Sequence, residues 1–130
     1  LVGGQWLEDD HYSRVGKQRW ADFVRFTVTS GAPHEYNSPA YGGIDLATLA
    51  DLSALTSDPL VKLQANILYE RLWLHLVVHL HRPTGQLTGP HCRCYWPQML
   101  TGQGPVKVQV PKVLWLTCQQ NPFPLMRDNA

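Results

Sequence analysis

Apolar positions recur at spacings of three and four residues in the first part of the chain, which is the pattern of amphipathic helices. The first such stretch runs from about Ser13 to Thr29. Its least polar face is formed by Trp20, Phe23, Val24 and Thr27. Ser13 is a suitable N-cap, and Gly31 is suited to the residue that ends a helix. The pattern therefore predicts a helix over residues 13–29.

Two further helices follow. Residues 45–56 have an apolar side, and Asp45 is a plausible N-cap for them. Next, Ser57-Asp58-Pro59 places a cap residue directly before a proline at the first helical position, where the missing N–H costs nothing. A third, long helix is predicted from Pro59 to His81.

The third predicted helix changes character along its length. Its first half is amphipathic, with an apolar side formed by Leu60, Leu63, Ile67 and Leu68. Its second half, residues 72–80, is apolar nearly all round, so it must be covered on most sides. Three helices offer too few neighbours for this. We therefore expect the chain to self-associate or to pack on the remainder of a larger helical protein.

The last third of the chain has a different pattern. Residues 106–110 alternate with period two and residues 113–116 are β-prone, which predicts a short β-hairpin. The proline-containing tail, 119–130, is typical of a poorly ordered terminus. The expected fold is mainly α, with a helical segment over residues 1–96 and a β-prone extension over 97–130.

Charge and hydropathy exclude two classes of partner. The 11 basic and 10 acidic residues are spread along the chain, and no basic block suggests nucleic-acid binding. The longest apolar stretch is interrupted by His75 and His79 and is far shorter than the roughly 20 residues needed to cross a bilayer, so no membrane partner is expected. No cofactor is predicted.

Two polar clusters carry the candidate chemistry. Residues 34–43 crowd imidazole, carboxyl, phenol and amide groups into a loop held by proline and glycine. Residues 89–96 form a second cluster after the predicted hairpin of helices. Loops of this composition are typical of binding sites on a helical scaffold. We expect the two clusters to meet in space.

These two loops resemble stretches of largely uncharacterised (α/α)-toroid proteins, which are similar in architecture to heparinase-type polysaccharide lyases and toroid glycoside hydrolases. The resemblance covers about residues 14–96 and rests on Glu35-Tyr36-Asn37-Ser38-Pro39-Ala40-Tyr41 and Gly89-Pro90-His91-Cys92-Arg93-Cys94-Tyr95. In those relatives Thr usually stands at the position of Ala40, and Ser or Asp at those of Cys92 and Cys94. The resemblance implies a partial toroid whose loops line a cleft for carbohydrate. A complete toroid needs about a dozen helices of roughly three turns or more, so this chain would be a segment.

The loop residues suit saccharide binding, because polar groups hold sugar hydroxyls and aromatic rings stack on apolar sugar faces. The candidate catalytic residues are Glu35, Tyr36, Tyr41 and His91. The candidate substrate-binding residues are Asn37, Arg93, Tyr95 and Trp96.

Two reactions are open. Elimination from a uronate needs a group that neutralises the acid (Asn37, His91 or Arg93) and a basic group, for which a tyrosine of lowered pKa would serve. Hydrolysis instead needs two carboxyl groups, roughly 5 to 10 Å apart. Glu35 is one, and Glu8, Asp9 or Asp10 are candidates for the second.

Structural roles account for the same residues. Glu35 and Arg93 could form an ion pair that ties the loops together. Asn37-Ser38-Pro39 could be a helix-entry turn, and the tyrosines could be core rings. The rival function is a non-catalytic helical interaction module that self-associates through the apolar part of helix 59–81.

Metal binding has weaker support. His75 and His79 share a helix face, but no third ligand is identified and Leu76 stands where a zinc-hydrolase motif has glutamate. Cys92 and Cys94 lack the two-to-four-residue spacer of structural zinc sites, and their spacing also makes a mutual disulfide strained. Free thiols, or a disulfide with Cys118, are the remaining options. We predict no metal.

Overall fold

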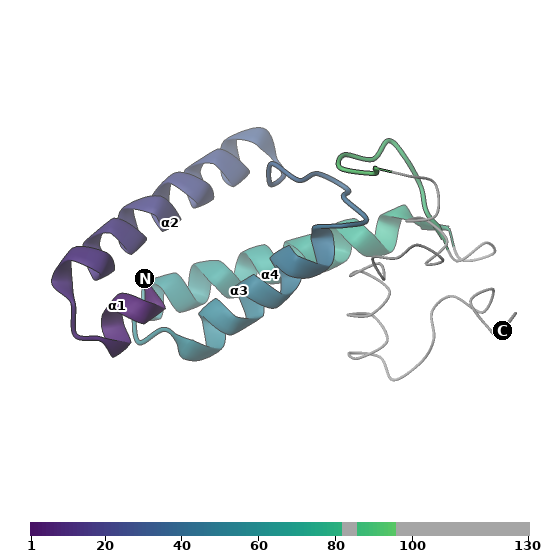
Figure 1. Ribbon diagram of the computed structural model, residues 1–130. Helices are drawn as coiled ribbons and strands as arrows, with labels where there is room; N and C mark the ends of the chain where they lie inside the picture. Colours follow the sequence, from purple (N-terminus) through teal and green to yellow (C-terminus); the bar gives the residue numbers. More distant parts are fainter. Residues whose placement is uncertain (82–85, 96–130) are drawn as a thin grey trace, which may run out of the picture. The chain divides into compact units, whose positions relative to one another are not determined.

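The computed structural model describes residues 1–81 and 86–95, and in this part of the chain it is mainly α-helical (Figure 1). The helices are α1 (Val2–Trp6), α2 (Asp10–Ser30), α3 (Gly42–Leu55) and α4 (Pro59–His79). Two short strands, β1 (Leu80–His81) and β2 (Gln86–Leu87), form an antiparallel pair with Leu80 opposite Leu87. The mainly α prediction is confirmed. The predicted β-hairpin at 106–116 and the tail lie outside the described residues.

The chain divides into two compact units. The first comprises Leu1–His34 and Thr48–Glu70. The second comprises Glu35–Ala47 together with the residues from Arg71 onward. The boundaries fall within α3 and α4, so each of these helices contributes one part to each unit.

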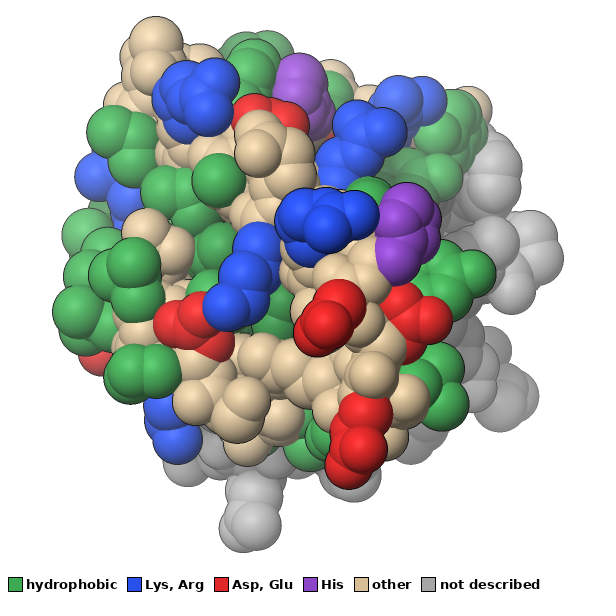
Figure 2. Space-filling model, turned by 90° about the vertical axis from the view of Figure 1, so that its left-hand side faces the viewer, with side chains coloured by type: hydrophobic (Ala, Val, Ile, Leu, Met, Phe, Trp, Pro, Cys, Tyr) green, Lys and Arg blue, Asp and Glu red, His purple; other side chains and the backbone are tan. Residues whose placement is uncertain are grey.

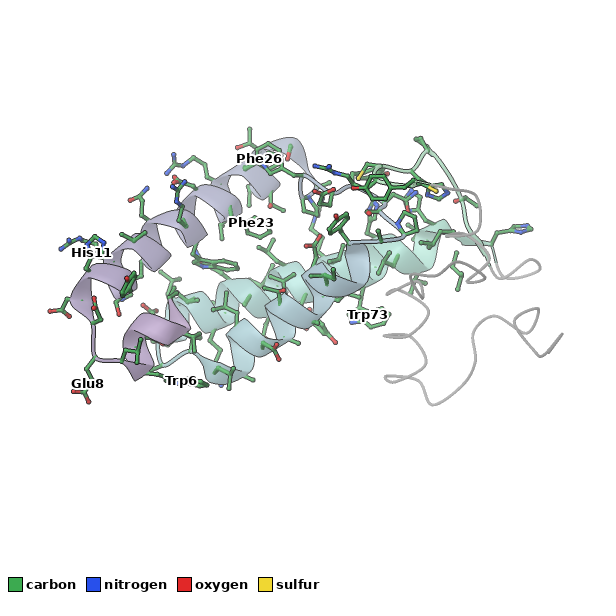
Figure 3. The ribbon with its side chains drawn as sticks, viewed as in Figure 1. Trp6, Glu8, His11, Phe23, Phe26 and Trp73 are labelled. Atoms are coloured by element: carbon green, nitrogen blue, oxygen red, sulfur yellow. The ribbon has the colours of Figure 1, made fainter. Side chains whose placement is uncertain are left out.

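In the first unit, α1 packs closely on α2. A Cβ atom at Gly4 would collide with the backbone of Ser13, and one at Gly16 would collide with Leu1. Glycine at these two positions therefore permits the approach of the two helices. The sequence pattern did not predict α1. In Figure 3, Glu8 of the connection between α1 and α2 and His11 of the first turn of α2 both point away from the helices.

Helix α2 begins at Asp10, three residues before the start predicted at Ser13. Asp9 is the N-cap, and its carboxylate accepts a hydrogen bond of 3.0 Å from the Tyr12 amide. The assignment of Ser13 as N-cap is wrong, because Ser13 lies in the first turn and its amide donates to the Asp9 carbonyl. The other end is as expected, since Gly31 adopts the left-handed conformation that ends the helix.

Helix α4 begins as the sequence indicates. The Asp58 carboxylate accepts hydrogen bonds from the amides of Leu60 and Val61, and it also pairs with Lys17 of α2 at 3.0 Å. The helix ends at His79 and not at His81, because Leu80 and His81 form β1.

The buried face of α4 differs from the predicted one. Its buried side chains are Val61, Ala65, Leu68, Leu72 and Leu76. Leu60, Leu63 and Ile67, which we expected to face the core, are exposed. This helix has apolar residues on more than one face, so periodicity alone does not show which face packs.

Charged side chains of both signs lie next to one another on the face shown in Figure 2. On α2, for example, the Arg25 guanidinium and the Asp22 carboxylate form an ion pair of 3.3 Å. No helix in the described part of the chain has the length and apolar character needed to cross a membrane.

Candidate functional site

The two polar loops meet within the second unit. Figure 1 shows the segment 86–95 beside the loop that leads into α3, near the end of α4. The Arg93 guanidinium pairs with the Glu35 carboxylate, with 3.0 Å between Nε and Oε2. The Cys92 amide donates to the Tyr36 carbonyl at 3.4 Å, and the Cys92 thiol lies 3.6 Å from the same Glu35 oxygen. The ion pair that the sequence suggested is therefore present.

Asn37 connects the two loops from the inside. Its side-chain amide nitrogen donates to the backbone carbonyls of Thr88 (2.6 Å) and Pro90 (2.9 Å). The backbone carbonyl oxygen of Asn37 lies 3.3 Å from Nδ1 of His91. The residue has a positive φ of 46°, a conformation that asparagine tolerates better than most residues. Only 3% of it is exposed. We expected Asn37 to contact substrate, but its amide nitrogen is occupied by the protein's own backbone.

The next residues start α3. The Ser38 hydroxyl accepts a hydrogen bond from the Tyr41 amide, and the Ser38 carbonyl accepts one from the Gly42 amide, both at 3.0 Å. Ser38 thus caps the turn that enters α3, followed by Pro39 at a favourable position. The assignment of Asp45 as the cap is wrong, because Asp45 lies within the helix and its amide donates to the Tyr41 carbonyl.

A phenol and two imidazoles form a second cluster in this unit. The Tyr36 hydroxyl lies 3.1 Å from Nε2 of His79, and Nδ1 of His79 lies 2.8 Å from the carbonyl oxygen of His75. The His75 ring contacts both neighbours, with ring centroids 4.5 Å from Tyr36 and 4.3 Å from His79. Burial lowers the pKa of His75, and electrostatic interaction with His79 and Arg71 lowers it further. This environment favours the neutral form of His75.

Asp45 supplies a carboxyl group that the sequence did not indicate for this role. Burial raises the pKa of Asp45 to about 6, and the negative charge of Glu35 contributes to this rise. Asp45 therefore retains a proton at a pH where an exposed aspartate has lost it. The expected second carboxylates, Glu8, Asp9 and Asp10, belong to the first unit, and Asp9 is the cap of α2.

The remaining phenols are linked to Arg93. Tyr41 hydrogen-bonds to Tyr95, which in turn hydrogen-bonds to Arg93. The bond with Tyr95 raises the pKa of Tyr41, although Arg93 acts in the opposite direction. A tyrosine that abstracts a proton needs a lowered pKa, so the environment of Tyr41 is unsuited to the basic role considered for it.

Most of the predicted site residues lie in this unit: Glu35, Tyr36, Asn37, Tyr41, His91, Arg93 and Tyr95. Trp96 lies outside the described residues. The sequence reasoning missed Asp45, which it assigned to a cap, and the link from Tyr36 to His79. The four-residue spacing of His75 and His79 was visible, but it suggested a metal.

The geometry of His79 argues against that metal role, because each of its ring nitrogens already lies within hydrogen-bond distance of an oxygen. In residues 1–81 and 86–95, no three His, Cys, Asp or Glu side chains are grouped so that they could hold a metal ion. The Cys92 thiol is also a poor nucleophile, since burial and the neighbouring Glu35 raise its pKa.

In comparisons by sequence and by structure, no protein-family model, curated protein or solved structure matches this chain. Any function must therefore be argued from the geometry of the polar cluster itself.

Proposed function

We propose that the polar cluster of the second unit binds an acidic saccharide and cleaves it. The observation that carries this proposal is the ion pair between Glu35 and Arg93, which brings the loops 34–43 and 89–96 together. Around this pair, the cluster combines carboxyl, guanidinium and phenol groups, a set suited to a substrate with both hydroxyl and carboxylate groups.

Arg93 is the proposed anchor for the acidic group. Its side chain is exposed, and its Nε atom is bonded to Glu35. A guanidinium has five N–H donors in a planar fork, so the bonds to Glu35 and Tyr95 leave others for a carboxylate of the substrate. The rings of Tyr36 and Tyr95, 37% and 53% exposed, offer surfaces on which the apolar face of a sugar can stack.

Two pairs of groups support cleavage. Glu35 and Asp45 are carboxyl groups in different environments, and the raised pKa of Asp45 suits a general acid in hydrolysis. Tyr36 and His79 form a hydrogen-bonded pair that suits proton abstraction, as elimination requires. The product distinguishes the reactions, because elimination creates a double bond that absorbs ultraviolet light and hydrolysis creates a new reducing end without one.

The test is binding and turnover of oligogalacturonate, with a neutral cello-oligosaccharide as the matched ligand. We expect the chain to bind the acidic oligosaccharide and Arg93→Ala to weaken this binding at least tenfold. Arg25→Ala is the control, because Arg25 is an exposed arginine on α2 in the other unit. Equal binding of both sugars, or equal losses in both variants, would refute the proposal. Other uronate polymers extend the test if oligogalacturonate is not bound.

The architecture is part of the same proposal: we propose that the helices belong to a larger ring of helical hairpins, an (α/α) toroid. The exposed apolar side chains of α4 support this, because a neighbouring hairpin would cover them. The coding sequence on either side of this chain provides the test. Several hundred further residues of paired helices would support the toroid, and flanking sequence without helical periodicity would count against it.

A second candidate function is self-association, favoured by Leu74, Val77 and Val78, which are exposed on α4. Sedimentation velocity over a range of concentrations tests it. We expect a concentration-dependent increase in mass if this surface joins two copies, and its loss in Val77→Asp. A monomer at all concentrations rules this candidate out without affecting the saccharide proposal.

A further inference from the structure

We propose that Tyr36 and His79 act as one proton-transfer pair, in which Tyr36 accepts a proton from the bound saccharide and His79 is the positioning residue that receives the phenol's own proton. This inference rests on the proposed function and adds the groups that move the proton.

The argument begins with the carbonyl of His75. A carbonyl oxygen can only accept a hydrogen bond, so Nδ1 of His79, 2.8 Å away, must carry a proton. In a neutral imidazole, the other nitrogen, Nε2, then has a free lone pair. The helix backbone of α4 thereby selects one tautomer of His79.

The tautomer determines the direction of the next hydrogen bond. Because Nε2 of neutral His79 can only accept, the Tyr36 hydroxyl at 3.1 Å must donate its hydrogen to it. Transfer of that hydrogen along the existing bond produces a phenolate and an imidazolium. The phenolate oxygen then takes the proton from the carbon beside the uronate carboxyl, and the electron pair of that C–H bond forms the new double bond as the glycosidic C–O bond breaks. The departing sugar oxygen keeps the electrons of that bond and takes a proton from the re-formed Tyr36 phenol, which regains its own from His79, so no oxidant or metal is required.

The surroundings favour this transfer. His75 packs on both rings, and its lowered pKa favours a neutral ring, which does not oppose an imidazolium on His79. The backbone of Tyr36 is held by the Cys92 amide, and that of His79 by the hydroxyl and amide of Thr88, which both donate to the His79 carbonyl. Both members of the pair are thus fixed to the segment 86–95, while the Tyr36 side chain remains partly exposed to a ligand.

The first experiment needs no substrate. Long-range nitrogen–proton NMR correlations of the 130-residue chain, at a pH where histidines are neutral, report the tautomer of each ring. We expect His79 to carry its proton on Nδ1, which is the less common form in water, and His11, which is exposed, to carry it mainly on Nε2. In Tyr36→Phe, the tautomer of His79 should persist and the Nε2 signal should move toward that of an unbonded nitrogen. An Nε2–H tautomer of His79 in the unsubstituted chain would overturn the proposal.

The second experiment uses oligogalacturonate turnover. Tyr36→Phe and His79→Phe should each lower kcat by roughly 10²- to 10⁴-fold, the usual contribution of a positioned acid or base, with little change in KM. His79→Gln retains a hydrogen-bonding side chain and should fold as the parent does, but without a proton acceptor of imidazole strength it should not rescue kcat. The matched control is Tyr12→Phe, an exposed tyrosine of α2.

The outcomes separate the two proposals. If oligogalacturonate binds and is cleaved at the parent rate by Tyr36→Phe, the proton-transfer pair is refuted while the proposed function stands. If no uronate oligosaccharide binds although the NMR spectra show the expected tautomer, the proposed function fails, and the inferred role in catalysis fails with it.

Discussion

Replacement of Asp45 by asparagine should stabilise the protein near neutral pH and leave its stability almost unchanged near pH 4. Asp45 has a pKa of about 6 in the folded chain, against an ordinary value of 3.8, because burial disfavours its charged form. A raised pKa means that the folded state holds the proton more tightly than the unfolded state does. The stability that this proton provides is complete below about pH 4 and is lost as the pH rises toward 6.

The size of the effect follows from the same shift. For a fully buried group, a rise from 3.8 to about 6 corresponds to about 3 kcal/mol. Because Asp45 is only half-buried, solvent screens its charge, and we take roughly half of this value, ~1.5 kcal/mol. Asparagine has nearly the same shape and no charge, so Asp45→Asn should gain about this free energy of unfolding above pH 6.

The assay is denaturant unfolding of the parent chain and Asp45→Asn at intervals from pH 4 to pH 8. The difference in unfolding free energy should be near zero at pH 4, grow up to pH 6 and then remain constant. Asp51→Asn is the control, because Asp51 is exposed on the same helix. A difference that does not vary with pH, or an equal gain in Asp51→Asn, would refute the reasoning. Carbon NMR of the Asp45 carboxyl provides a direct titration that does not depend on how cooperatively the two units unfold.

Three further predictions concern stability. Gly4→Ala should lower the unfolding free energy by about 1 to 3 kcal/mol, because the added Cβ meets the backbone of α2. At Gly3 the added Cβ has open space, so Gly3→Ala should raise the unfolding free energy by up to roughly 1 kcal/mol. Thermal melts compare the two variants, and equal effects would contradict the close packing of α1 on α2. Asn37→Ala should lower the unfolding free energy by roughly 1 to 3 kcal/mol, because the carbonyls of Thr88 and Pro90 lose their donor. Amide hydrogen exchange should then increase in the segment 86–95, and unchanged exchange there would contradict the role of Asn37 in holding this segment. The hydrogen bond with Lys17 and those with the amides of α4 lower the pKa of Asp58, so its carboxylate stabilises the fold above about pH 4 and loses that effect in acid. Asp58→Asn should therefore reduce stability at pH 7 more than at pH 3. Circular dichroism melts at the two pH values test this, and an equal loss at both would contradict it.

Local patterns in the sequence determined the helices α2, α3 and α4 and several of their ends, but not α1. The apolar spacing of α2, the left-handed Gly31 and the Asp58-Pro59 start of α4 depend on interactions within a few residues, so they can be read without knowledge of the fold. The meeting of the two polar loops also followed from sequence, because the segments before α3 and after α4 adjoin the same end of the helical hairpin.

Only the tertiary structure decided which groups became chemically special. Burial and the charge of Glu35 raise the pKa of Asp45. The local sequence pattern contains neither effect, and it led to the incorrect assignment of Asp45 as a helix cap. Likewise, the spacing of His75 and His79 showed a shared helix face, but the hydroxyl that approaches His79 comes from Tyr36, 43 residues earlier. Desolvation and long-range hydrogen bonds depend on which segments pack together, and the periodicity of a single helix contains no information about its neighbours.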